Sequence, residues 1–518
     1  MPKLFSPDTS RLTRPEGTTS QTDAVSARYR HGSPAELVTD MEAIVGADNV
    51  HGRLTDLVRF SSDAGPYRSI PNIVVSPRNA ADLSALMAYC EANDRHMTFR
   101  AAGTSLNGQA MSDDILVDVK THFSGMEVRE GGTKLWSRPG VILGDAQAVL
   151  SRHGFMLGPD PGSTSVCTIG GVLADNSGGM RCSLERDSYH SVEELVFVLP
   201  SGTIVDTTKG DDAFRAQEPE LHADLLAFRD KLRANTDMVE FLRTKFSIRN
   251  TNGLRIDAFL DEDEPVHILK RLLVGSEGIF GAITESVIRT VKLPRVKATT
   301  WVELPNLRDA ANFVHPIMET GAEACELLVA PVMRRSAEHY SHAPESWRTL
   351  DDDAAALLVE VGGSDEAELE QAMERLRTVL ADAPLLRPLE FLTTPEGMRG
   401  AWELRNGLYG LLGADRPNGT AYITEDVCFP PYQVGEAAAD LMDLQAKYGY
   451  PESVMGHAAF GNLHFFFTPR FDREEERESY ANFLDDLAEL VIDKYQGSMK
   501  AEHGTGAVSY THLRAHET

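Results

Sequence analysis

Short apolar runs alternate with amphipathic helical patterns from residue 34 onward, and this alternation predicts an α+β chain. Between residues 34 and 61, apolar side chains recur at helical spacing and predict a helix followed by a short connection. IPNIVVSP predicts a strand because it is rich in β-branched residues and closed by proline. NAADLSALMAYCEAND predicts a helix capped by Asn79, and MTFRAAG and DDILVDV predict two more strands.

A second series of elements follows. ELVFVLPSGTIVD predicts a hairpin that turns at Ser201 and Gly202, whereas the charged residues 208–265 predict a helical insertion. ITESVIRTVKLP predicts an alternating strand ended by proline, so we expect a domain boundary at residue 294. Beyond it, WVELP, CELLVA and AALLVEVGG predict strands between two helices. That β-α-β-β-α-β order predicts a split, ferredoxin-like sheet.

Length and composition support this division. With 518 residues, the chain is long enough for two or three domains. We expect a flexible segment at 1–33, a first domain at 34–294 and a second at 295–507. The net charge of -28 argues against nucleic-acid binding, because such a surface repels phosphate. The five cysteines show no zinc or iron-sulfur spacing, and no apolar window has signal-peptide or transmembrane length. We expect a cytoplasmic protein, with peripheral contact at the inner membrane left open.

Three glycine-rich segments indicate a phosphate-bearing ligand. They are RAAGTSLNGQA at 100–110, GPDPGSTSVCTIGGVLADNSGGM at 158–180 and VGSEGIFGAITE at 274–285. Glycine lets backbone N–H groups approach a pyrophosphate closely, and hydroxyl groups add hydrogen bonds to its oxygens. Each segment taken alone is equally typical of a tight turn.

Taken together, these segments resemble the FAD-binding module of the vanillyl-alcohol oxidase and p-cresol methylhydroxylase superfamily. The resemblance implies a PCMH-type module of two subdomains followed by a substrate-binding cap domain. It implies that FAD is bound by Ala101, Ala102, Gly103, Thr104, Ser105, Gly108, Gln109, Pro161, Gly162, Ser163, Thr168, Gly170, Gly171, Asn176, Ser177, Gly178, Glu277, Gly278, Gly281 and Ile283. No GxGxxG follows the first strand, so NAD is not implied.

We expect the FAD to be bound without a covalent link. Relatives that attach flavin through a histidine carry it on the first glycine-rich loop, and no histidine lies between Phe99 and Val119. Cys167 is near the position where cysteinyl-flavin relatives carry their link. A small buried residue is the interpretation we favour for it.

Histidines and a carboxylate near residue 500 suggest a metal site. In VMGHAAFGNLHFFF, His457 and His464 would lie on opposite faces of a regular strand, but a bulge at Gly461 would give them a shared face. SMKAEHGTG adds Glu502 beside His503. Two histidines and one carboxylate, with coordination positions left open, suit a divalent cation that also binds substrate oxygens, and we expect zinc or manganese.

The set GH(x)6H followed by EHG resembles the FAD-linked oxidases that oxidise D-2-hydroxy acids, namely D-lactate, glycolate and D-2-hydroxyglutarate dehydrogenases. The resemblance covers residues 34–506. It implies that His457, His464 and Glu502 ligate the metal, that His503 is the general base, and that Arg405 binds the substrate carboxylate. We therefore expect an FAD-dependent dehydrogenase that forms a 2-oxo acid and passes electrons to quinone, a cytochrome or an iron-sulfur domain.

Two alternatives remain open: an FAD oxidase of sugars or alcohols, and a non-catalytic flavin-binding electron-transfer subunit. The substrate is open as well, because lactate needs an apolar pocket whereas 2-hydroxyglutarate needs a second cation, for which Arg334 and Arg335 are candidates. Residues 508–518 resemble translated adapter sequence, and we expect them to lack a counterpart in the family. We expect this tail to be non-native and the second domain to be truncated before an iron-sulfur domain.

Overall fold

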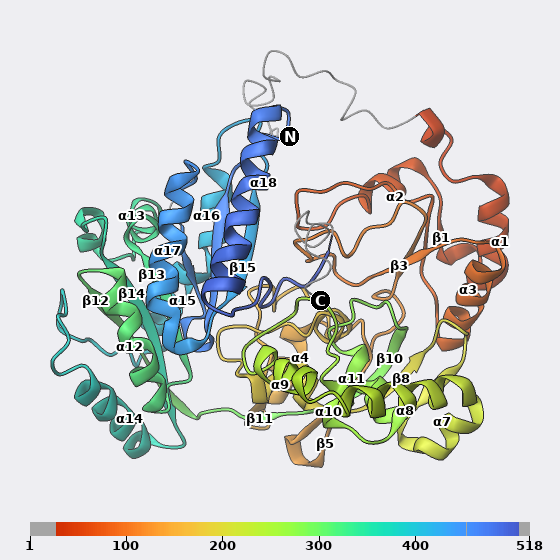
Figure 1. Ribbon diagram of the computed structural model, residues 1–518, viewed down its shortest axis with the longest axis horizontal. Helices are drawn as coiled ribbons and strands as arrows, with labels where there is room; N and C mark the ends of the chain where they lie inside the picture. The colour runs from red at the N-terminus through yellow and green to blue at the C-terminus, as the bar shows by residue number, and fades with distance from the viewer. Residues whose placement is uncertain (1–26, 452, 507–518) are drawn as a thin grey trace, which may run out of the picture.

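The computed structural model describes residues 27–451 and 453–506 (Figure 1). Most of the predicted flexible segment at 1–33 and the predicted non-native tail at 508–518 lie outside the described residues. Among the described helices, none combines the length and apolar character needed to cross a membrane.

The first part of the chain contains a small mixed sheet with the order β1-β2-β4-β3, in which β2, β4 and β3 are parallel. Its strands are β1 (Val50–His51), β2 (Ile73–Val75), β3 (Met97–Arg100) and β4 (Ile115–Asp118). Its helices are α1 (Ala35–Val45), α2 (Leu54–Arg59) and α3 (Ala80–Ala92). The Asn79 side chain accepts a hydrogen bond from Asp82 N at 3.1 Å, so the predicted cap of α3 is confirmed.

An antiparallel sheet with the order β5-β6-β10-β8-β9 follows. Its strands are β5 (Met126–Arg129), β6 (Lys134–Ser137), β8 (Val192–Val198), β9 (Ile204–Asp206) and β10 (Ala282–Arg289). The predicted hairpin is confirmed, since β8 pairs with β9 and Gly202 in the turn has a φ of 83°. A separate pair joins β7 (Phe155–Met156) to β11 (Val291–Lys292). Helices α4 (Leu143–Ser151), α5 (Ile169–Asp175) and α6 (Ser188–Ser191) lie between these strands in sequence.

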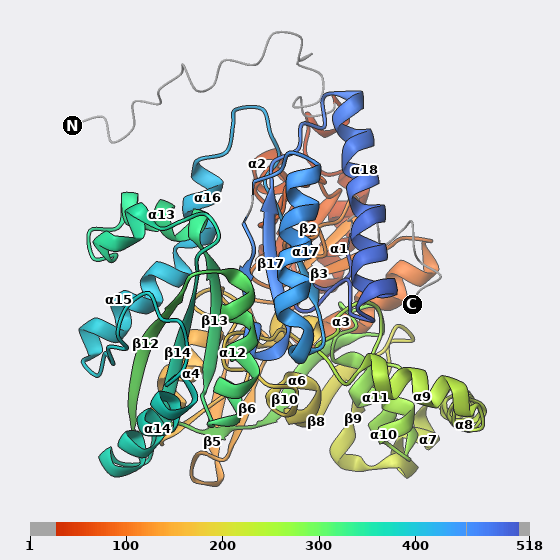
Figure 2. The ribbon, with the colours of Figure 1, turned by 60° about the vertical axis from the view of Figure 1, so that its left-hand side comes forward.

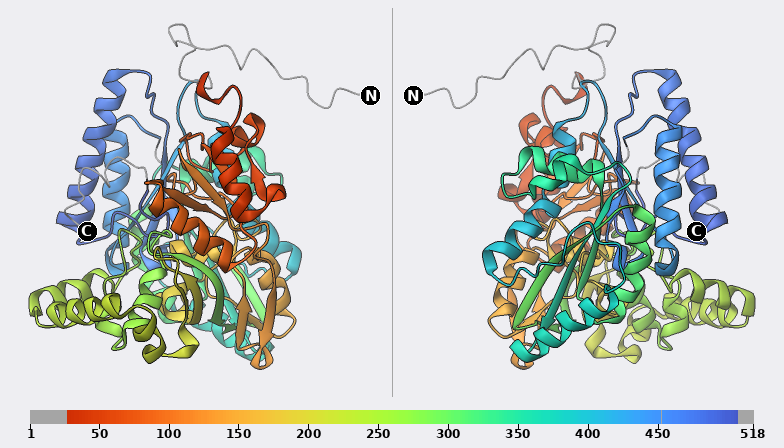
Figure 3. Two further views of the ribbon diagram at one scale, coloured as in Figure 1. Left: turned by 90° about the vertical axis from the view of Figure 1, so that its right-hand side faces the viewer. Right: turned by 90° about the vertical axis from the view of Figure 1, so that its left-hand side faces the viewer.

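The charged segment after β9 is helical, as predicted. It forms α7 (Asp211–Gln217), α8 (Pro219–Arg233), α9 (Thr236–Lys245), α10 (Ala258–Asp261) and α11 (Pro265–Leu273). Helix α11 packs its apolar residues into the core of the antiparallel sheet. Helices α7 to α9 project to one side of the molecule (Figure 2 and Figure 3).

The second part of the chain is built on a six-stranded antiparallel sheet with the order β12-β14-β13-β16-β17-β15. The strands are β12 (Val296–Leu304), β13 (Ala324–Val329), β14 (Ala355–Gly363), β15 (Ile423–Cys428), β16 (Met455–Gly456) and β17 (Asn462–Phe467). The helices are α12 (Leu307–Glu319), α13 (Ala330–His339), α14 (Glu366–Val379), α15 (Pro395–Asn406), α16 (Leu408–Ala414), α17 (Val434–Lys447) and α18 (Glu474–Ala488).

The split arrangement expected for this sheet is present, because β14 lies between β12 and β13. The segment near Leu392 joins the outer edge of β12 through a bridge to Thr299. The sheet is larger than the predicted motif, since β16, β17 and β15 extend it at the β13 edge. Among the added strands, β17 carries His464 and β16 ends next to His457, so this extension positions the candidate site.

Candidate active site

A cavity of about 640 Å³ lies between the glycine-rich loops of the first part and the strands β15, β16 and β17 of the second. All of the residues predicted to bind FAD line it, except Gly108 and Asn176. The Asn176 side chain turns away because it donates to Asp187 Oδ2 at 3.1 Å and accepts from Tyr189 N at 2.9 Å. Gly108 has a φ of 83° and serves the turn of its loop. These two residues do not line the cavity, and their predicted contact with FAD stays a prediction.

The cavity wall fits a flavin dinucleotide. A Cβ added at Gly162 would meet no atom within 4 Å, so its backbone borders open space. Gly170 at the start of α5 packs against Pro139. A Cβ added to Gly170 would lie 2.4 Å from the Cβ of Pro139, so glycine is needed for α5 to lie this close to the cavity wall. Burial, strengthened by the neighbouring Asp175, raises the pKa of Glu277 well above its ordinary value. Glu277 lines the cavity, and the raised pKa favours the uncharged form of its carboxyl.

Cys167 is 5% exposed and lines the same cavity. Burial raises the pKa of its thiol, which lowers the thiolate fraction available as a nucleophile. The side chain also belongs to the core around the antiparallel sheet, in agreement with the small buried residue we favoured.

A turn, and not the predicted bulge, brings the two histidines together. His457 follows β16, a 3-10 turn spans Ala458–Phe460, and Gly461 reverses the chain with a φ of 77° before β17 begins. A Cβ at Gly461 would lie 1.9 Å from Phe429 O, so this position requires glycine. As a result the rings of His457 and His464 lie with centroids 5.0 Å apart.

Glu502 completes this group from the loop that precedes Gly504. Its Oε2 lies 3.2 Å from His457 Nε2 and 3.7 Å from His464 Nε2. One ligand atom from each of the three residues lies within 4.8 Å of the others, and all three are buried. Two imidazoles and a carboxylate at this spacing fit the donor set of a divalent cation.

A buried carboxylate supports His457 from behind. Glu326 on β13 is 0% exposed, accepts from His457 Nδ1 at 2.8 Å and accepts from Arg405 Nε at 2.7 Å. Burial alone would raise the pKa of Glu326, but His457 and Arg405 lower it to about 2. With Nδ1 donating to this carboxylate, the Nε2 lone pair of His457 faces Glu502 and is free to ligate a metal.

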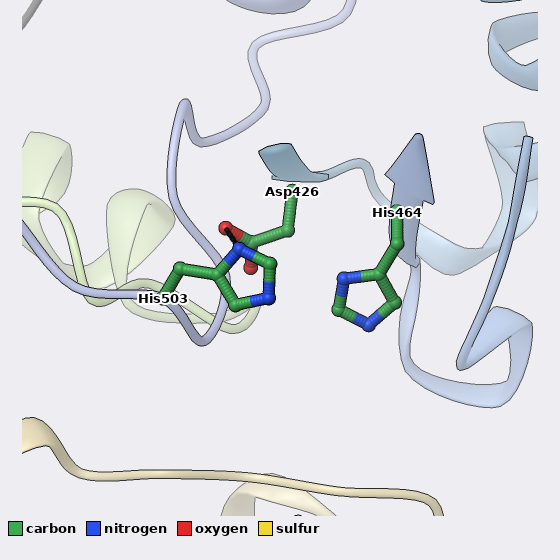
Figure 4. A group of neighbouring side chains, drawn as sticks. All are labelled: Asp426, His464 and His503. Carbon is green, nitrogen blue, oxygen red and sulfur yellow. Dashed lines mark ion pairs between the residues drawn. The ribbon is translucent and has the colours of Figure 1, made fainter. Parts of the chain in front are cut away.

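Asp426 and His503 form a second group that shares His464 (Figure 4). His503 Nδ1 lies 3.3 Å from Asp426 Oδ1, and the His503 ring stacks on His464 with centroids 5.1 Å apart. Burial lowers the pKa of His503 to about 4, although Asp426 opposes the shift. His503 is therefore neutral near pH 7 and able to accept a proton.

Arg405 lies near the end of α15 and lines the cavity. Its Nε is bound to Glu326, whereas no hydrogen bond from its two terminal nitrogens to a described residue is found. Arg334 and Arg335 are not part of the cavity wall. Arg334 donates to Leu350 O and Asp352, and Arg335 pairs with Glu338 and Asp415 on the surface of the second part. The suggestion that these two arginines bind substrate is therefore wrong.

Three supporting residues escaped the sequence analysis: Glu326, Asp426 and Arg249. Arg249 is buried, forms an ion pair with Glu502 and donates to Gly179 O at 3.1 Å. Asp426 Oδ2 accepts from the backbone N–H of Ala501 at 3.0 Å, which holds the loop of Glu502 and His503. For Glu326 the available signal was a lone acidic residue inside the apolar stretch ACELLV, because a buried charge needs a specific partner. Arg249 and Asp426 carried no such local signal.

Comparison with known families agrees with this arrangement. Residues 71–208 match the family model for an FAD binding domain, and residues 293–517 match the model for the C-terminal domain of FAD linked oxidases. The two matched ranges contain most of the residues that line the cavity, and the third glycine-rich segment lies between them. The chain therefore combines an FAD binding domain with the C-terminal domain of FAD linked oxidases.

The chain is also similar to curated proteins. It is 26% identical over 473 residues to the glycolate oxidase subunit GlcD of Bacillus subtilis, covering 90% of this chain and 87% of that protein. It is 26% identical over 486 residues to the D-2-hydroxyglutarate dehydrogenase of Escherichia coli, covering 87% of this chain but 46% of the relative. It is 24% identical over 448 residues to the D-lactate dehydrogenase of Anaerostipes hadrus, covering 84% of this chain and 82% of that protein. The chain thus spans less than half the length of the Escherichia coli relative.

Solved structures share the fold. An alkyldihydroxyacetonephosphate synthase matches with a TM-score of 0.64 and 14% identity, over 94% of this chain and 82% of that chain. A p-cresol methylhydroxylase with substrate bound matches with a TM-score of 0.63 and 12% identity, over 94% of this chain and 91% of that chain. The predicted PCMH-type module followed by an α+β domain is confirmed.

Proposed function

We propose that this protein oxidises a D-2-hydroxy acid to the 2-oxo acid, with FAD as oxidant and a divalent cation held by His457, His464 and Glu502. One observation carries the proposal: Arg405, His503 and the three candidate metal ligands all line the cavity that the glycine-rich loops also line. An arginine beside an uncharged imidazole and a cation site is suited to a substrate with adjacent carboxylate and hydroxyl groups.

The relatives support this choice of substrate class. Three similar proteins are named for glycolate, D-2-hydroxyglutarate and D-lactate. Each of these compounds has a hydroxyl on the carbon next to a carboxylate. A sugar or alcohol oxidase would have no use for Arg405 at this position.

Each residue has a distinct task. The terminal nitrogens of Arg405 bind the substrate carboxylate in a planar fork, while Glu326 holds its Nε. His503 accepts the hydroxyl proton, and Asp426 orients its ring. When bound, FAD supplies the acceptor for the hydride from the α-carbon, and the cation supplies Lewis acidity at the hydroxyl oxygen. The 2-hydroxy acid thereby loses one hydride and one proton, and the electrons then leave for an acceptor other than oxygen.

The test is anaerobic mixing of the FAD-loaded protein with D-lactate, glycolate and D-2-hydroxyglutarate. Loss of visible flavin absorbance with at least one of them is expected. Retention of the absorbance with every 2-hydroxy acid tried would refute the proposed function.

The cation is tested separately. Dialysis against a chelator should abolish turnover, and zinc or manganese should restore it. His464→Ala should lower kcat/KM by at least about 100-fold because it removes one ligand. His315→Ala is the matched control. His315 lies on the exposed side of α12, and its Nε2 lies 3.5 Å from Glu319 Oε1. Full turnover after chelation would exclude the metal role.

A further inference from the structure

One stretch of the cavity wall takes no part in the proposed reaction. It is formed by Thr424 on β15, Phe466 on β17 and Tyr409 at the start of α16. In an antiparallel pair, directly opposite residues project from the same face of the sheet. The register pairs Asp426 with His464 and Thr424 with Phe466. The uncharged pair Thr424 and Phe466 therefore lies next to Asp426 and His464 on the same face of the sheet.

The surroundings of Phe466 are aromatic and apolar. Tyr422 stacks on its ring with centroids 5.4 Å apart and planes 2° apart, and Tyr409 lies 6.2 Å from it. Met455 on β16 pairs with His464 in the register and lines the same space. Tyr409, Thr424, Met455 and Phe466 therefore form a neutral wall next to the candidate metal and base residues.

Among the described residues, no second arginine or lysine lines the cavity. Arg405 is the single arginine or lysine among the described residues that line the cavity, and the proposed function assigns it to the carboxylate beside the reacting carbon. The alternative candidates, Arg334 and Arg335, are paired on the surface. A second carboxylate placed against the neutral wall would lose water without gaining an ionic partner.

We infer that the 2-hydroxy acid oxidised at this site has an apolar side chain, aliphatic or aromatic, that packs against Tyr409, Met455 and Phe466. This inference rests on the proposed function and specifies its substrate class. Contact with aromatic rings favours such a side chain through removal of apolar surface from water. Dicarboxylic 2-hydroxy acids are disfavoured by the same wall.

The test compares flavin reduction in the FAD-loaded, metal-loaded protein by acids that differ only in the side chain. D-2-hydroxyisocaproate and D-phenyllactate represent apolar side chains, and D-malate and D-2-hydroxyglutarate represent dicarboxylates. The apolar acids should show a second-order rate constant at least about tenfold higher. Equal or faster reduction by the dicarboxylates would overturn the inference while leaving the proposed function intact. Reduction by D-lactate or glycolate but by none of these four acids would overturn the inference alone. Absence of reduction by all six acids would refute the proposed function, and the inference with it.

A charge variant provides an independent measurement. Tyr409 is 40% exposed, so Tyr409→Arg adds a cation at this wall without filling the core. The ratio of rate constants for D-2-hydroxyglutarate over D-2-hydroxyisocaproate should rise by about tenfold. Tyr432→Arg, at a 76% exposed position outside the cavity, adds the same charge and should leave the ratio unchanged. An unchanged ratio in Tyr409→Arg, with flavin still bound, would contradict placement of the side chain at this wall.

Discussion

Replacement of Glu326 by leucine would remove a carboxylate that contacts both His457 and Arg405. Glu326 is 0% exposed, and the side chain of Arg405 is 12% exposed, so the guanidinium would be left without its buried partner. Removal of one member of a buried ion pair costs about 3 to 5 kcal/mol of stability. His457 would also lose the acceptor for Nδ1, and loss of such a supporting carboxylate lowers metal affinity by about 10- to 100-fold.

Two measurements separate these effects. Urea unfolding monitored by tryptophan fluorescence reports on the second part of the chain, where Trp301, Trp347 and Trp402 lie. Calorimetric titration of the chelator-treated, FAD-loaded protein with zinc reports metal affinity. Glu326→Gln keeps an acceptor oxygen and should lose less affinity than Glu326→Leu.

The matched control lies just before the same strand. Glu323 pairs with Arg186 at 3.0 Å, but the two side chains are 24% and 39% exposed. Glu323→Leu should therefore cost no more than about 1 kcal/mol and leave metal affinity unchanged. If Glu326→Leu bound zinc within about twofold of the unmodified protein, the argument that Glu326 orients His457 for ligation would be wrong.

Three further predictions concern other parts of the site and fold. Arg249→Met should lower kcat/KM at least about tenfold with flavin content unchanged, since Glu502 loses its buried cation; equal kinetics would exclude this positioning role. Asn79→Ala should destabilise the first part by about 1 kcal/mol through loss of the α3 cap, measured by thermal unfolding. Burial alone would raise the pKa of Glu360, but Arg181 and Lys297 lower it to about 2, so its stabilising effect is present above pH 4.5 and lost as the pH falls toward 2. Glu360→Gln should therefore show a shallower loss of unfolding midpoint in acid.

Local patterns were sufficient for the elements whose signals lie within a few residues. The capped helix α3, the hairpin at Gly202 and the strand β10 all follow from cap, turn and alternation rules. The three glycine-rich segments indicated the cofactor cavity because glycine permits close backbone approach wherever the chain folds. These features depend on short-range sterics and hydrogen bonds.

Long-range contacts decided the rest. The bulge expected at Gly461 is a turn. The local pattern could not predict it, because the turn depends on Phe429, which packs against Gly461 from another strand end. The six-stranded sheet was also larger than the β-α-β-β-α-β order implied, since strand pairing between β13 and β16 joins residues far apart in sequence.

By itself, the sequence identified the residues to which we assign the proposed chemistry: His457, His464, Glu502, His503 and Arg405. The tertiary structure alone placed Glu326, Asp426 and Arg249 behind them, and it separated Arg334 and Arg335 from the cavity. The physical reason is that the partner of a buried charge is chosen by packing in three dimensions, across separations of up to 253 residues in the pair Arg249 and Glu502.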